Sequence, residues 1–69
     1  MKQVFAQRLM EIRTDNMLSQ RDMAQILHVS QVAVCRWEQG VNSPNIEALY
    51  RICKAFDVTA DYMLGLSDI

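Results

Sequence analysis

The chain of 69 residues lacks a long apolar run, and its charges are not segregated in the way a secretory leader requires. No apolar stretch approaches the roughly 18 residues that a membrane-spanning helix needs. The charged residues among the first fifteen are Lys2, Arg8, Glu11, Arg13 and Asp15. With charges of both signs spread in this way, a signal peptide is not expected. Because 69 residues leave no room for a second domain, the sequence predicts a single domain over residues 1–69.

Histidine and cysteine are too scarce to indicate a catalytic or metal site. His28 is the only histidine, and no serine, cysteine or carboxylate arrangement surrounds it in the sequence. Cys35 and Cys53 lie in different predicted helices, without the spacing of metal ligands. We therefore expect two free thiols in a reducing cytoplasm, no metal, no cofactor and no enzymatic activity, and no small-molecule site is evident.

Positive charge is also scarce, although it is unevenly distributed. The net charge is −1, whereas a nucleic-acid-binding domain is expected to be basic. Residues 1–40 carry five Lys/Arg and four Asp/Glu, which gives +1, and residues 41–69 carry two and four, which gives −2. The acidic surplus therefore lies in the second half of the chain.

What the sequence does contain is a pair of short helices joined by a tight turn between Ser19 and Gly40. Ser19 and Ser30 are good N-caps for helices over 20–27 and 31–39, and Asp22 follows Ser19 at the spacing of a capping box. Apolar residues recur at helical spacing on one face of each helix: Met23, Ala24 and Leu27 in the first, Val34 and Trp37 in the second. Four residues of the second helix then point away from the core, with groups that can contact base edges in a major groove: Gln31, Val32, Cys35 and Arg36.

Three further helices are predicted, so the fold class is all-α. The first covers residues 3–15, with a core stripe of Phe5, Leu9 and Ile12, and Asn16 is expected to take the left-handed conformation after it. Asn45 caps a helix over 46–56 that buries Leu49, Ile52, Cys53 and Phe56. Thr59 caps the last, over 60–64, which Gly65 ends.

From Phe5 to Leu66 the sequence resembles the Cro/cI-type helix-turn-helix domain, or XRE family, of lambdoid phage repressors. The matching residues are Arg13, Leu18-Ser19-Gln20, Met23-Ala24, Val29-Ser30, Trp37 to Gly40, Pro44 and Asp61 to Leu66. The resemblance implies a compact five-helix bundle with the helix-turn-helix at its second and third helices. His28 stands where the family usually has glycine, so local strain is expected there.

The resemblance also implies roles for individual residues. Arg13 and Glu38 would form a largely buried ion pair that fixes the angle of the second helix of the motif. Gln20 would contact a phosphate, the other interpretation being a solvated residue at a helix start. Asn42, Ser43 and Asn45 would add phosphate contacts, although turn formation alone also explains them.

The residues expected at DNA complete the candidate interface. A Gln at position 31 can bond an adenine edge, Val32 can meet thymine methyl groups or join the core, and Arg36 can read guanine, bind phosphate or stay solvated. With Arg21, Arg36 and either Lys2 or Arg8 near DNA, only a few phosphates per protomer are neutralised, so a shallow salt dependence is expected. The full predicted set is Gln20, Arg21, Gln31, Val32, Ala33, Cys35, Arg36, Asn42, Ser43 and Asn45.

The function predicted from these features is sequence-specific binding of double-stranded DNA by a cytoplasmic, nucleoid-associated transcriptional repressor or regulator of phage or mobile-element type. A homodimer on a palindromic operator is expected, because one such helix covers only a few base pairs. The candidate dimer surface comprises Tyr62, Met63, Leu66 and Ile69, although Tyr62 and Met63 could instead complete the core of the monomer. The alternatives are a protein-interaction module on the same fold, such as an antitoxin or antirepressor partner, and the DNA-binding fragment of a longer protein.

Overall fold

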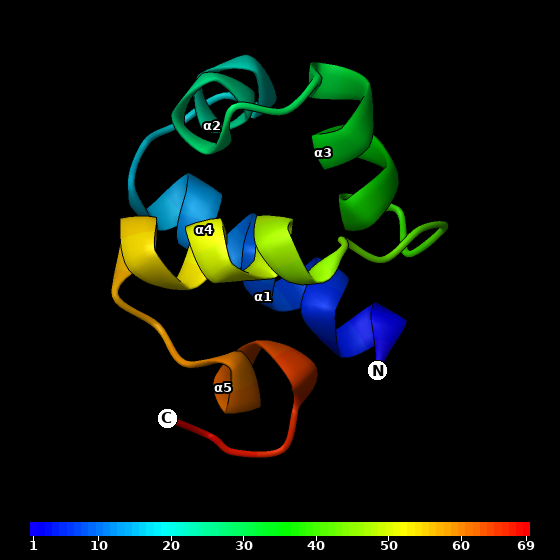
Figure 1. Ribbon diagram of the computed structural model, residues 1–69, viewed down its shortest axis with the longest axis vertical. Coiled ribbons are helices and arrows are strands. Elements are labelled where there is room, and N and C mark those ends of the chain that lie inside the picture. Colours follow the sequence, from blue (N-terminus) through cyan, green and yellow to red (C-terminus); the bar gives the residue numbers. More distant parts are fainter.

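Five helices make up the regular structure of the computed structural model, which describes residues 1–69 (Figure 1). They are α1 (Lys2–Asp15), α2 (Gln20–Leu27), α3 (Gln31–Glu38), α4 (Ile46–Phe56) and α5 (Ala60–Leu64). No strand is present, so the predicted all-α, five-helix class is confirmed. The expected boundaries differ by one residue at the start of α1 and at the end of α3. None of the helices has the length and apolar character needed to cross a membrane.

Four of the helices begin at a side-chain cap, as the sequence predicted. Ser19 accepts a hydrogen bond from the Asp22 backbone N–H at 3.0 Å, and the Asp22 carboxylate accepts one from the Ser19 N–H at 3.0 Å. This reciprocal pair is a complete capping box. α3, α4 and α5 are capped by Ser30, Asn45 and Thr59, respectively. Each of these side chains accepts a hydrogen bond from the backbone N–H three residues later. These caps satisfy backbone donors that helix starts leave unpaired.

The helix ends rely on the left-handed backbone conformation, which three residues other than glycine adopt. His28 has φ 57°, as expected for the turn between α2 and α3, and Asp57 has φ 54°. After α1 the left-handed residue is Met17 at φ 57°, and Asn16 stays at φ −93°, which corrects the expectation for Asn16. The Asn16 side chain donates to the Ile12 carbonyl at 2.7 Å and so holds Asn16 against the last turn, which leaves the reversal to the next residue.

The core forms where α1, α2 and α3 meet, with α4 and α5 closing it. The predicted core stripes of α1, α2 and α3 are all buried, and Ala6 joins them. In α4 the prediction was only partly right, because Ile52 is buried whereas Leu49, Cys53 and Phe56 are half-buried. The other buried residue of α4 is Ala48, which lies one turn before Ile52 and was not among the predicted core residues.

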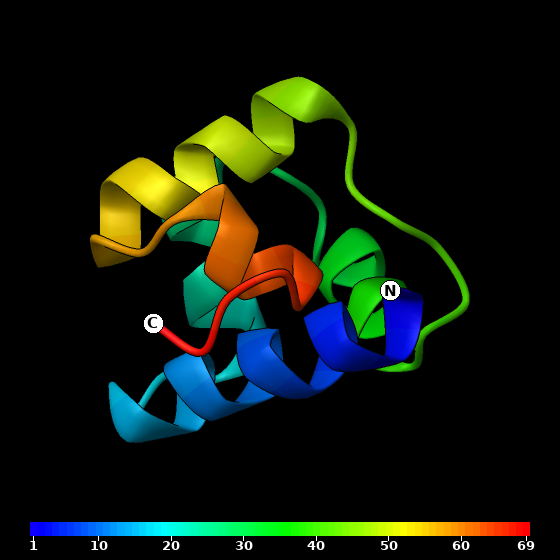
Figure 2. The same cartoon turned by 90° about the horizontal axis from the view of Figure 1, so that it is seen from below.

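The helix-turn-helix unit occupies one end of the molecule. In Figure 1 α2 and α3 lie at one end of the long axis and α5 at the other, with α1 and α4 between them. Both Figure 1 and the perpendicular view in Figure 2 place the start of α1 on the same side as α3 and the α3–α4 loop. The C-terminus and the end of α4 lie on the opposite side in both views.

Candidate nucleic-acid interface

The outward face of α3 carries the predicted reading residues. Gln31, Val32 and Arg36 are exposed, with 57% of Val32 accessible to solvent. Val34 and Trp37 fill the core on the opposite face, which confirms the helical phase inferred from the sequence. Cys35 and Ala33 are half-buried, and Ala33 packs against the core, so these two contribute less open surface than the other three.

A surface groove of about 420 Å³ runs beside α3 and collects residues from three separate segments. Val32, Ala33 and Arg36 line it from α3, and Asn42 and Ser43 line it from the α3–α4 loop. The structure therefore brings together five of the residues predicted to meet DNA. Lys2, from the first turn of α1, also lines this groove.

An adjoining groove of about 390 Å³ lies between α3 and the start of α4. Ala33, Ser43 and Asn45 are the predicted residues along it. The Asn45 side-chain oxygen caps α4 through the Ala48 N–H at 2.8 Å, so only its amide N–H₂ group is free to donate to a ligand.

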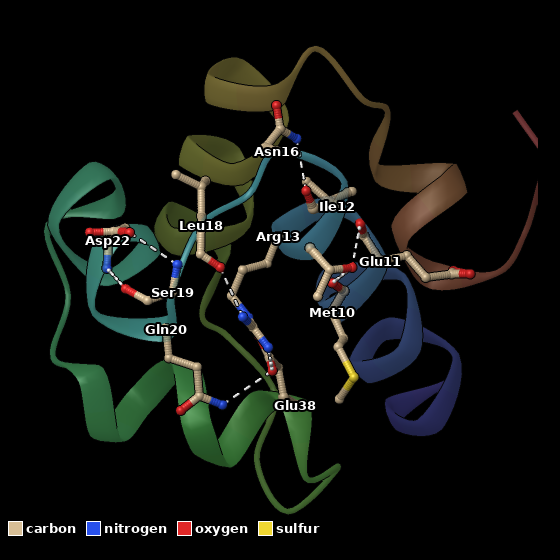
Figure 3. A network of polar contacts seen from close by, with 11 residues as sticks. Met10, Glu11, Ile12, Arg13, Asn16, Leu18, Ser19, Gln20, Asp22 and Glu38 are labelled. Atoms are coloured by element: carbon tan, nitrogen blue, oxygen red, sulfur yellow. Dashed lines mark hydrogen bonds and ion pairs between the residues drawn. The ribbon is translucent and has the colours of Figure 1, made fainter.

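A buried ion pair fixes α3 against α1, as Figure 3 shows. Arg13 Nε donates to Glu38 Oε2 at 2.7 Å and Arg13 Nη2 donates to Glu38 Oε1 at 3.1 Å. The side chains are 16% and 2% exposed, respectively. The bidentate contact raises the pKa of Arg13 above its usual value, with burial opposing the shift. Arg13 Nη1 also donates to the Leu18 carbonyl at 2.9 Å, which ties the α1–α2 connection into the same network.

Gln20 has a structural partner that sequence reasoning missed. Its side-chain amide donates to Glu38 Oε1 at 3.2 Å, so the first residue of α2 is tied to the end of α3 (Figure 3). The Gln20 side-chain oxygen has no partner within the chain. A phosphate contact by Gln20 therefore stays a prediction and would use the backbone N–H at the start of α2. Gln20 and Glu38 are both among the residues by which the sequence resembles the XRE family. Their spacing along the chain does not predict that the two side chains touch.

The net charge of −1 is unusual for a nucleic-acid-binding domain, but the negative charges are not spread evenly along the chain. Between residues 23 and 46 the only carboxylate is Glu38, which is buried and paired with Arg13. Arg8 pairs with Asp68 and Arg51 with Glu47, whereas Lys2, Arg21, Arg36 and Lys54 form no ion pair. The segment that carries α3 and the α3–α4 loop therefore has no exposed carboxylate. No group of three or more His, Cys, Asp or Glu side chains is placed to hold a metal ion.

The C-terminal segment divides between core and surface. Met63 is 0% exposed, so for this residue the alternative of a core position holds, which corrects its assignment to a dimer surface. Tyr62 is half-buried, and its ring lies 4.2 Å from the Arg8 guanidinium carbon. Arg8 also donates to the carbonyls of Tyr62 and Ser67, which holds the C-terminal segment on α1.

Two of the four residues proposed for a dimer surface therefore remain exposed. Leu66 is 75% and Ile69 is 92% accessible to solvent. A hollow of about 230 Å³ lies beside Ile69 and is lined on its apolar side by Ile12, Val58 and Tyr62.

Comparison with known proteins agrees with this geometry. A family model described as helix-turn-helix matches residues 9–63. The HTH-type transcriptional activator BcrR of Enterococcus faecalis is 42% identical over 61 residues, which are 88% of this chain and 30% of that protein. The uncharacterised HTH-type transcriptional regulator YobD of Bacillus subtilis (strain 168) is 26% identical over 65 residues, 94% of this chain and 58% of that protein. The chain thus spans about a third to three fifths of the length of these relatives. Among solved structures none matches.

Proposed function

This chain belongs to the XRE-type helix-turn-helix family, a family of DNA-binding transcriptional regulators, and we propose that it binds a specific operator in double-stranded DNA by placing α3 in the major groove. The observation that carries the proposal is the exposed row of Gln31, Val32 and Arg36, on a helix whose opposite face is locked into the core. An α-helix with its side chains is about 10–12 Å across, which fits the roughly 12 Å width of a major groove.

The three exposed residues of α3 have different tasks in this proposal. Gln31 bonds an adenine edge through both atoms of its amide, and Val32 packs against thymine methyl groups. Arg36 binds guanine or a phosphate, and only the first of these contacts depends on the base. Neutral donors from Asn42, Ser43 and Asn45 hold the backbone of the DNA and replace the cations that the α3–α4 loop lacks.

A homodimer on a palindromic operator is the second part of the proposal. The domain measures 27 × 23 × 21 Å, which is shorter than the roughly 34 Å between successive major-groove sites on one face of DNA. A single domain therefore covers one half-site, and two-fold pairing supplies the other. The exposed side chains of Leu66 and Ile69 are the apolar groups that we expect a second copy to cover.

We infer repression as the effect on transcription, by analogy with the phage repressors that the sequence resembles. The E. faecalis relative is named an activator, so activation is the competing outcome. A promoter-reporter fusion carrying the selected operator distinguishes the two effects.

Selection of bound sequences from a random duplex pool tests the proposal. Enrichment of a palindrome with half-sites one helical turn apart is the expected result. Recovery of no enriched sequence by the folded protein would contradict DNA reading and favour the protein-interaction alternative, in which the same exposed face of α3 meets a protein partner.

A further inference from the structure

The groove between α1 and α3 has the chemistry of an anion site. Its polar lining consists of the cations Lys2 and Arg36 and the neutral side chains of Ser30, Asn42 and Ser43, and no carboxylate lines it. The adjoining groove differs, because Glu47 lies along it and pairs with Arg51 at 2.7 Å. Of the two grooves beside α3, only the first is therefore suited to a negatively charged ligand.

No ion pair within the domain explains why Lys2 lies along this groove. The side chain is exposed, and none of the three ion pairs of the domain includes it. Lys2 is also in the first turn of α1, where a positive charge opposes the helix dipole. A cation that is unfavourable for its own helix and lies beside the proposed reading helix fits a role in ligand binding.

We propose that Lys2 binds a backbone phosphate of the operator, at a subsite that it forms with Asn42 and Ser43 beside α3. This inference rests on the proposed function and adds a contact from a segment nearly thirty residues before α3. The sequence left Lys2 and Arg8 as equal candidates for such a contact. The structure separates them, since Arg8 is held by Asp68 and by the carbonyls of Tyr62 and Ser67.

The salt dependence of binding measures this contact directly. Each neutralised phosphate contributes about −0.9 to the slope of log K against log[salt]. The three unpaired cations of each protomer that are expected near DNA, Lys2, Arg21 and Arg36, give a slope of about −5 for a dimer. Removing the charge of Lys2 from both protomers makes the slope shallower by about 1.8. The ratio of wild-type affinity to variant affinity therefore falls about tenfold between 50 and 200 mM salt.

The experiment compares Lys2→Ala with two matched variants on the operator selected by the wild-type protein. Lys54→Ala removes the same charge from the end of α4, which lies on the side of the molecule opposite the start of α1 (Figure 1). Lys2→Arg keeps the charge. Affinities are measured at several salt concentrations against the operator and its single-base changes, and thermal melts verify folding.

The expected result is a shallower slope for Lys2→Ala alone, with unchanged base preference and a melting temperature equal to or above that of the wild type. Slopes that are the same for Lys2→Ala and Lys54→Ala would overturn the subsite, as would a changed preference at one base pair, which would make Lys2 a base reader. Either result leaves operator binding by the wild type intact. Failure of the proposed function would instead appear as the absence of any selected operator.

Discussion

We expect the ion pair between Arg13 and Glu38 to contribute more to the free energy of unfolding than its N–O separation of 2.7 Å alone suggests. A second pair, Arg51–Glu47, has the same 2.7 Å separation but side chains that are 38% and 70% exposed, against 16% and 2% for Arg13 and Glu38. The two pairs thus share one separation and differ in burial and in geometry, because Arg13–Glu38 is bidentate and Arg51–Glu47 is a single bond within one helix.

Truncating one partner of a buried pair costs about 3–5 kcal/mol, because the other charge stays buried without compensation. Arg13→Ala falls at the upper end, since Glu38 keeps only the bond from Gln20. Glu38→Ala falls at the lower end, since Arg13 keeps the Leu18 carbonyl and some contact with water. The double variant leaves no lone charge and should cost about 2 kcal/mol less than the sum of the single changes.

Denaturant unfolding of the four proteins in each cycle measures the coupling. We expect about 2 kcal/mol for Arg13–Glu38 and no more than about 0.5 kcal/mol for the exposed pair at the (i, i+4) spacing. A domain of this size has a total stability of about 3–10 kcal/mol. If Arg13→Ala is unfolded, Arg13→Met, which removes the charge and keeps the aliphatic chain, completes the cycle. Equal coupling in the two pairs would refute the argument from burial.

Three smaller predictions follow from local structure. His28→Gly should stabilise the domain by under about 1 kcal/mol, because relief of the left-handed strain exceeds the added entropy of the unfolded chain; a lower melting temperature would contradict this. The capping-box bonds from Ser19 lower the pKa of Asp22 in the folded protein. The stability that this carboxylate provides is therefore present above its pKa in the unfolded chain, about 3.9, and is lost as the pH falls through its lower pKa in the folded protein. Asp22→Asn should flatten that part of the pH profile in thermal melts. Burial raises the pKa of the Cys53 thiol, so a thiol reagent should modify Cys35 faster, and operator DNA should slow only Cys35; equal rates would show that burial does not control the two thiols.

Much of the fold could be predicted because caps and apolar periodicity are local signals. Ser19, Ser30, Asn45 and Thr59 mark the helix starts through bonds that span three residues. The errors arose where tertiary contacts decide. The burial of Ala48 depends on how closely α4 approaches its neighbours, which periodicity does not encode.

The candidate site was predictable along α3 and less so across segments. Helical phase alone assigns Gln31, Val32 and Arg36 to the surface. The bond from Gln20 to Glu38 and the place of Lys2 beside Asn42 and Ser43 join residues far apart in the chain. Met63 looked like surplus apolar surface for a short helix, but α5 packs on α1 and α4, and its Met63 side chain is completely covered.

The most direct test of DNA reading by α3 is the affinity of Gln31→Ala for the selected operator and each of its single-base changes. Gln7→Ala, an exposed amide on α1, is the matched control. The loss of a bidentate amide contact should cost about 1–3 kcal/mol on the selected operator and remove the preference at one base pair, while Gln7→Ala leaves both unchanged. Full affinity and unchanged preference in folded Gln31→Ala, with the same result for Val32→Ala and Arg36→Ala, would show that α3 does not read the DNA.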